Sequence, residues 1–426
     1  MDAPRSKVFR FAAYAAASSF AIWIPFWALW FRRHLASDLE LTFVDVTFWV
    51  GMLVFQLPVG VVADRIGRKR TILLSEGFRT AGILGYGLGA SFLEYQVANI
   101  VWSLGAAFSI GTSAYLYEAL LEAGHEAEFP RTIGRMTTIQ LGSNAAGAFA
   151  GGLVVAWTGQ IQMTLFLGAA WNLVAIGIAA TFVEPDVART TEPTFGEQLV
   201  QGWRVVRRRE GIALLIGLEV VLGTALYAMA LFRPIYLTQA LGFSEAEVAL
   251  WVSAFLLVAA AVSAFAGDLA AALGEFGTLA FLVAVSAASF VGLWALGAAW
   301  YAVFAQAPMY VAWSLHSPLT TAFLNRRLEP GQRATVLSMG AFAFTLGLVG
   351  LLPLVGFVTT ATSDLRLLGL ALGLLTVVPG TYVLVRWRTR VAPWPAVTPI
   401  PTRLLPDSAR LSRFHRFLER MSRLKP

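Results

Sequence analysis

Residues 60–72 read Gly-Val-Val-Ala-Asp-Arg-Ile-Gly-Arg-Lys-Arg-Thr-Ile, and no other segment says as much about the architecture of the chain. The segment closes a long apolar run with a glycine turn that holds one acid and four bases. A helix needs about 20 apolar residues to cross the ~30 Å hydrocarbon core of a bilayer, and basic residues gather in the loops on its cytoplasmic side. The segment therefore predicts a membrane helix that ends at the cytoplasm.

The composition also indicates a membrane protein. Of the 426 residues, 57% are hydrophobic and 13% are charged, whereas soluble domains carry roughly 25% charged residues. Cysteine is absent, which excludes disulfides, thiolate metal sites and a cysteine nucleophile. The first apolar run, at about 9–31, is too long for a signal-peptide core and lacks a small-residue cleavage site. We therefore expect it to be retained as a span.

Twelve apolar segments are long enough to cross a membrane. Each is expected to be helical, because backbone polar groups in lipid must be paired within the segment. The predicted spans are 9–31, 44–63, 71–92, 96–121, 133–157, 163–183, 212–232, 246–266, 276–298, 301–323, 334–358 and 365–385. The predicted fold class is an all-α integral membrane protein with twelve transmembrane helices in two six-helix bundles.

The basic residues predict the orientation. With both termini inside, most of the 32 lysines and arginines lie in the inner loops and the C-terminal tail, as the positive-inside rule requires. The net charge of +7 belongs to this asymmetry and faces anionic lipid, so no nucleic-acid partner is expected. The predicted location is the cytoplasmic (inner) cell membrane, with both termini cytoplasmic.

A polar interruption divides the chain into two halves. We predict an N-terminal bundle, an amphipathic cytoplasmic linker, a C-terminal bundle and a proline-rich basic cytoplasmic tail, at 1–188, 189–211, 212–386 and 387–426. In the linker, Thr194-Phe-Gly-Glu197 has the form of a capping box and predicts a short helix along the inner membrane surface. In the tail, apolar and basic residues over 410–424 repeat at helical spacing and predict a second such helix. This helix is interpreted as resting on the membrane, with partner or lipid sensing as the alternative.

On these features the chain resembles the major facilitator superfamily of secondary transporters. Gly60-x-x-x-Asp64-Arg65-x-Gly67-Arg68-Lys69-Arg70 matches the signature loop of that superfamily between helices two and three. Three further segments look like a bacterial group within it that is largely without assigned substrates; they are 108–118, 134–135 and 333–338. The resemblance covers about residues 8–386 and implies alternating access between two halves around a small-molecule substrate. We expect a monomer without a cofactor, surrounded by the lipid bilayer, with the proton as coupling ion.

The signature loop predicts a conformational latch. Its candidate members are Gly60, Asp64, Arg65, Gly67, Arg68, Lys69 and Glu118. The two glycines permit close helix contact and a tight turn. The resemblance implies that Asp64 meets the positive end of helix eleven, which begins near Ala334, and that Arg68 pairs with Glu118. We interpret the group as a latch that holds the outward-open state; the alternative is a positive-inside anchor with a structural salt bridge.

Two departures from related transporters limit the resemblance. Many proton-coupled relatives have an arginine four residues before a glycine in helix four, but here Val101 precedes Gly105 at that distance. Coupling through that arginine is therefore excluded. The helix-five element of drug–proton antiporters keeps its glycines at 147–152 but lacks its proline, which favours efflux only slightly.

Ionisable groups inside spans are costly and are therefore candidates for coupling. Glu219 in span seven could bind a cation or cycle a proton, and a carboxylate near the inner interface is the alternative. His316 in span ten has a side chain suited to proton coupling, and a helix–helix hydrogen-bond donor is the alternative. Asp45 and Glu76 lie near span ends, where we expect interface solvation to explain them.

The resemblance implies that helices one, four, seven and ten line the substrate cavity. Candidate cavity residues are Trp23, Gln140, Asn144, Tyr227 and Gln306. Trp23 could stack on a sugar ring or a lipophilic cation; the amides could bind a polar substrate or join helices. Arg79 lies inside span three, and the predicted cavity helices carry no arginine or lysine away from their ends. A small, highly anionic substrate is therefore disfavoured.

We interpret the chain as a carrier that moves a small organic solute by rocking its two bundles. Proton-coupled efflux of amphipathic compounds is favoured by the aromatic cavity, Glu219 and the helix-five glycines. Uptake of a solute such as a sugar or metabolite, by symport or facilitated diffusion, is the alternative; a non-transporting receptor or assembly partner is a remote one. An enzyme and a metal site are not expected, because the four histidines form no ligand pair.

Overall fold

The computed structural model describes residues 3–185 and 195–391, and in these ranges the chain is helical with no strand. The helices of the N-terminal half are α1 (Ala3–Ser19), α2 (Trp27–His34), α3 (Asp38–Ile66), α4 (Arg68–Leu88), α5 (Phe92–Phe108), α6 (Ile110–Glu122), α7 (Phe129–Thr158) and α8 (Ile161–Ala180). The later helices are α9 (Phe195–Arg208), α10 (Glu210–Ile235), α11 (Glu245–Ser263), α12 (Ala266–Leu296), α13 (Ala307–Arg327), α14 (Pro330–Thr362) and α15 (Leu365–Arg386). Short 3₁₀ or π segments lie at Glu126–Glu128, Tyr236–Ala240, Trp300–Gln306 and Trp387–Val391.

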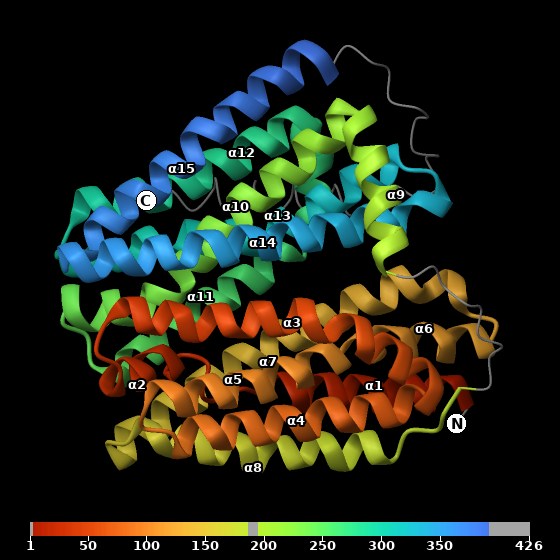
Figure 1. The fold of residues 1–426 in the computed structure, drawn as a ribbon, viewed down its shortest axis with the longest axis horizontal. Coiled ribbons are helices and arrows are strands. Elements are labelled where there is room, and N and C mark those ends of the chain that lie inside the picture. The colour runs from red at the N-terminus through yellow and green to blue at the C-terminus, as the bar shows by residue number, and fades with distance from the viewer. Residues whose placement is uncertain (1–2, 186–194, 392–426) are drawn as a thin grey trace, which may run out of the picture.

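These helices form two side-by-side bundles (Figure 1). The N-terminal half contributes α1–α8 and the C-terminal half α10–α15, and the halves meet where α3 packs on α14 and α7 packs on α11. The largest apolar core contains buried residues of both halves, from Ala21 to Trp387. The predicted all-helical membrane fold is thus confirmed, while the predicted domain boundaries stay a prediction.

Eight helical segments of the described chain are long and apolar enough to cross a membrane. A ninth counts if Asp38–Gln56 and Pro58–Ile66, which are bent by 55°, form one span. Helices also lie at the three remaining expected places, but α1, α4 and α13 are too short or too polar to be counted by length and composition. The number of twelve therefore stays a prediction.

The first span was predicted to be one continuous helix, but the structure breaks it between α1 and α2. The break holds Pro25, which has no backbone N–H to donate to a helix. Two glycines of α7 lie against its backbone: a Cβ at Gly147 would be 2.8 Å from Ala21 N, and one at Gly151 would be 2.1 Å from Ile22 O. The fourth span is likewise divided into α5 and α6, at Ser109.

The linker contains helix α9, which packs on α14. A Cβ at Gly202 would lie 3.0 Å from Thr335 O, so the two helices are in close contact there. The predicted helix start at Thr194 and the predicted tail helix at 410–424 lie outside the described residues.

Candidate functional site

The signature loop lies at one end of the bundles, which we call the signature end; the opposite end is the far end. Gly67 joins α3 to α4 with φ +93, and a Cβ there would lie 2.5 Å from a carboxylate oxygen of Glu184. That carboxylate accepts hydrogen bonds from the backbone N–H groups of Arg68, at 2.5 Å, and Lys69, at 2.8 Å. Glu184 therefore caps α4, and glycine is needed at position 67. This role of Glu184 was not predicted from the sequence.

Arg68 pairs with Glu118, as the family resemblance implied, and also with Asp64, which was not predicted. Its Nε donates to Glu118 Oε1 at 2.8 Å and its Nη1 to Asp64 Oδ1 at 3.0 Å. Burial alone would lower the pKa of Arg68, but the hydrogen bond and charge of Glu118, followed by those of Asp64, raise it above the ordinary value. All three residues belong to the N-terminal half, so these ion pairs do not themselves bridge the halves.

Other parts of the predicted latch differ. A Cβ at Gly60 would meet no atom within 4 Å, so the close helix contact expected there is absent from this structure. The adjacent Val61 and Val62 are exposed, so within residues 3–185 and 195–391 no helix of the other half covers their side chains. Arg65 is also exposed and Lys69 is half-buried. The contact of Asp64 with the start of α14 stays a prediction, because the side chain of Ala334 is not among those described.

In the C-terminal half, the two coupling candidates lie together. Glu219 on α10 and His316 on α13 are 3.8 Å apart, measured from Oε1 to Nε2, and Thr320 donates a hydrogen bond to the same carboxylate. The other ring nitrogen of His316, Nδ1, is 2.9 Å from the carbonyl oxygen of Trp313. Gly223 makes room for this approach, since a Cβ there would lie 3.3 Å from His316 Nε2.

This geometry suits the holding of one proton. If Nδ1 carries the hydrogen that the Trp313 carbonyl accepts, a neutral His316 presents a lone pair at Nε2, near Glu219. A carboxylate and a lone pair repel each other, so a proton on either group turns the contact into an attractive one. The Glu219 side chain is 19% exposed, which leaves a route for water or substrate.

Asp45 is buried rather than solvated at a span end, contrary to the prediction. It is only 4% exposed, because α3 begins at Asp38, six residues before the predicted span. Tyr227 of the other half donates to its Oδ1 at 3.1 Å, and its Oδ2 has no hydrogen-bond partner among the described residues. Trp49 packs edge-on against Tyr227 and against Phe344, with ring centroids 5.1 and 5.6 Å apart. Tyr227, a cavity candidate, therefore joins the two halves.

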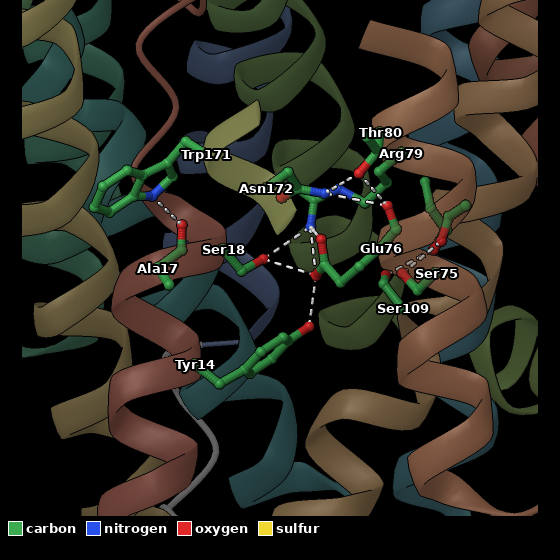
Figure 2. Close-up of polar contacts among 12 residues, drawn as sticks. Tyr14, Ala17, Ser18, Ser75, Glu76, Arg79, Thr80, Ser109, Trp171 and Asn172 are labelled. Atoms are coloured by element: carbon green, nitrogen blue, oxygen red, sulfur yellow. Dashed lines mark hydrogen bonds and ion pairs between the residues drawn. The ribbon is translucent and has the colours of Figure 1, made fainter. Parts of the chain in front are cut away.

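Glu76 is also buried, with no exposed surface, and it is the centre of a polar cluster in the N-terminal half (Figure 2). Its Oε1 accepts hydrogen bonds from Tyr14 at 2.6 Å, Ser18 at 2.8 Å and Arg79 at 3.1 Å. Asn172 of α8 donates to the backbone oxygen of Glu76 and to Thr80, so it joins α8 to α4. The interface solvation expected for Glu76 is wrong, because α4 carries it well inside the bundle against α1.

The remaining cavity candidates are dispersed. Trp23 is 8% exposed and packs edge-on against Trp102, 5.2 Å away, which makes it part of the core. Gln306 is fully buried, and neither its Oε1 nor its Nε2 has a hydrogen-bond partner among the described residues. Gln140 and Asn144 lie half-buried on α7. None of these residues lines the surface pocket of about 490 Å³ beside Arg386 or that of about 250 Å³ beside Arg33.

The fold and the buried ionisable groups define a polytopic membrane carrier built from two helical bundles. Residues 10–351 match the sequence model of the Major Facilitator Superfamily, and the chain belongs to this family. As such it is a membrane transporter and not an enzyme.

Two bacterial proteins are similar in sequence to this chain. The chain is 30% identical over 142 residues to the multidrug resistance protein Stp of Mycobacterium tuberculosis, which covers 32% of this chain and 26% of Stp. It is 28% identical over 286 residues to the enterobactin exporter EntS of Escherichia coli, which covers 62% of this chain and 64% of EntS. In both cases the match spans less than two thirds of the relative.

Solved structures share the fold. The nucleoside transporter NupG superposes with a TM-score of 0.73 at 12% identity, over 91% of this chain and 100% of NupG. A bacterial homologue of the human lysosomal transporter Spinster, in an inward-facing and unoccupied conformation, gives 0.70 at 15% identity, over 93% and 100%. At these identities the likeness concerns the fold alone.

Proposed function

We propose that this protein exports amphipathic organic compounds from the cytoplasm in exchange for protons, by alternating access. It works as a monomer in the cytoplasmic membrane, with both termini inside. The observation that carries the proposal is the contact of Glu219 with His316, 3.8 Å apart on facing helices of the C-terminal half.

A proton-coupled carrier needs a group that exchanges a proton while access alternates. Glu219 lies nine residues into α10, about 14 Å from its start at 1.5 Å per residue, and it is partly exposed. A proton between Glu219 and His316 neutralises a costly intramembrane charge, and its release restores a carboxylate that can accept the next proton.

The contacts between the halves support an inward-facing state. At the far end and toward the middle, the halves touch through Asp45 and Tyr227, at 3.1 Å, and through Ser253, which donates to Ala145 O at 2.8 Å. At the signature end the exposed face around Gly60 is consistent with halves that have moved apart. We propose that the latch residues hold the opposite, outward-open state.

The names of the two sequence relatives, a multidrug resistance protein and an enterobactin exporter, also favour efflux. Uptake by symport or facilitated diffusion is the second candidate, because a proton held between Glu219 and His316 would serve symport as well as antiport. A non-transporting receptor would keep the fold but would not move any solute.

Everted membrane vesicles with an imposed proton gradient and a pH-sensitive dye test the proposal. A panel of lipophilic cations, antibiotics and sugars is added to wild type, Glu219→Gln and Glu329→Gln. Glu329 is a matched control, because its side chain is 72% exposed and lies in the same half. We expect proton release with one compound class, lost in Glu219→Gln and kept in Glu329→Gln. Silence of correctly inserted wild-type protein across the panel would refute proton-coupled efflux in favour of uptake.

A further inference from the structure

Arg79 is an intramembrane cation that the coupling site does not use. It lies eleven residues into α4, about 16 Å from the start of that helix. A guanidinium at this depth is costly unless it is paired or performs a function. Its position between α1 and α5 therefore calls for an explanation beyond the positive-inside pattern.

Arg79 is only partly paired. Its Nη1 makes all of its hydrogen bonds in the described chain, to Ser18 Oγ at 2.9 Å and to the two carboxylate oxygens of Glu76 at 3.1 and 3.4 Å. Its Nε and Nη2 have no partner there. The Arg79 side chain is 23% exposed, whereas that of Glu76 is fully buried. The N–H groups of Nε and Nη2 form one planar edge of the guanidinium, and such an edge can bind a carboxylate in bidentate fashion.

Glu76 does not depend on Arg79 alone. Tyr14 and Ser18 both donate to its Oε1, at 2.6 and 2.8 Å, so the carboxylate has other hydrogen bonds (Figure 2). The pair holds Arg79 in place through Nη1, and three of its five N–H donors, those on Nε and Nη2, have no partner in the described chain.

An aromatic surface lies beside the open edge. The Arg79 guanidinium carbon is 5.1 Å from the ring centroid of Trp102 on α5, and Trp102 itself packs on Trp23. The stem of Arg79 is fixed by Gly105, where a Cβ would lie 2.9 Å from Arg79 Cγ. A rigid cation next to an indole face is suited to a ligand with both an anionic group and an aromatic or apolar body.

We propose that Arg79 binds the anionic group of the transported compound and that Trp102 packs against its apolar body. The ligand class is an amphipathic organic monoanion with a carboxylate or a similar planar anionic group. One guanidinium shared with Glu76 suits a single negative charge, so a phosphate ester stays disfavoured. This inference rests on the proposed transport function and gives it a substrate class.

Equilibrium binding to purified protein in nanodiscs of zwitterionic lipid tests the site. The probe is radiolabelled 1-naphthoate, and its neutral amide, 1-naphthamide, is the matched control ligand. We expect saturable binding of naphthoate and binding of the amide weaker by about tenfold or more, since hydrogen bonds from a guanidinium to a carboxylate are stronger than those to a neutral amide. Arg79→Gln removes this preference, whereas Arg366→Gln, which alters an exposed arginine paired with Asp364, leaves it unchanged.

Glu76→Gln separates a binding role from a structural one. Removing the competing carboxylate should tighten naphthoate binding, whereas a purely structural pair would lose stability without gaining affinity. If Arg79→Gln does not fold because Glu76 is left unpaired, the double variant Glu76→Gln/Arg79→Gln has no unpaired charge and should fold without binding naphthoate.

Three results would overturn the inference: equal binding of naphthoate and its amide, naphthoate binding that survives in Arg79→Gln or the double variant, and no saturable naphthoate binding at all. Loss of binding when phosphatidylglycerol is added would assign the edge to a lipid headgroup instead. None of these results bears on the vesicle assay, which tests the proposed efflux separately.

Discussion

The two ends of the molecule are held together in different ways. At the far end, backbones of the two halves come within contact of each other: a Cβ at Gly356 of α14 would lie 2.9 Å from Leu39 Cα, and Leu39 N–H donates to Thr360 at 3.0 Å. At the signature end, the ion pairs join residues of the same half, as in Arg68–Glu118 at 2.8 Å and Arg327–Glu275 at 2.5 Å.

This difference explains how each half can stay rigid while the interface between the two halves moves. Charged pairs within a half keep each bundle rigid at the end that faces the basic loops. Close packing through glycines is strong only while the surfaces fit, because interhelical contact in a membrane depends on shape rather than on the hydrophobic effect. The far end is thus a contact that can separate as a unit.

Locking the far end should have the largest effect. A Cβ at Gly152 of α7 would lie 3.0 Å from Ala249 Cβ on α11, close to the 3.5–4.5 Å that a disulfide requires. The double variant Gly152→Cys/Ala249→Cys should cross-link on oxidation and lose transport completely, with recovery on reduction. The chain has no cysteine, so there is no background reaction. The measurement is the vesicle assay before and after reduction.

A cross-link within one half is the control. A Cβ at Gly85 of α4 would lie 2.8 Å from Ala98 Cβ on α5, in the same bundle. Gly85→Cys/Ala98→Cys should cross-link equally and keep transport. Persistent transport in the oxidised Gly152→Cys/Ala249→Cys protein would mean that the far end does not open during the cycle.

A smaller effect is expected from Tyr227→Phe. It removes the hydroxyl that donates to the buried Asp45 across the interface, and a buried charged acceptor without its donor costs about 1.5–3 kcal/mol. The far end should open about 10- to 100-fold more often. The readout is the rate at which an impermeant maleimide labels Thr42→Cys, because Thr42 has no exposed surface while this end is closed.

Tyr301→Phe provides the comparison for that variant. Tyr301 is 49% exposed, so the loss of its hydroxyl should leave the labelling rate unchanged. Equal labelling of Tyr227→Phe and wild type would show that the Asp45 contact does not hold the far end closed.

The sequence predicted features that depend on nearby residues better than contacts between residues that are far apart in the chain. The helical membrane fold was predictable from the length of the apolar segments, and the pair of Arg68 with Glu118 was implied by the family resemblance. Glu219 and His316 were each chosen as ionisable groups within spans. They are 97 positions apart in the sequence, so their contact could not be predicted from it. No periodicity indicates that two such residues face each other across a bundle.

The misplaced residues have physical causes as well. Asp45 and Glu76 were assigned to solvated interfaces because the helix ends were placed by hydropathy, and polar first turns such as 38–43 escape that criterion. Arg79 was set aside because helix three was not expected to face substrate. The contact of Arg79 with Ser18, which lies near the end of α1 just before the break in the first span, places Arg79 near the interior of the bundle.

The smallest effect is expected at an ion pair that joins the two halves at the far end, between Arg33 on α2 and Glu245 on α11. Their side chains are 46% and 23% exposed, and exposed pairs contribute about 0–1 kcal/mol. Arg33→Gln should therefore raise the labelling of Thr42→Cys by less than about fivefold, and salt should reduce even this difference, because the screening length falls to about 3 Å at 1 M. Arg366→Gln, which breaks a pair with Asp364 of the same half, should leave the rate unchanged. A salt-resistant rise as large as that of Tyr227→Phe would mean that charge, and not close packing, holds the far end shut.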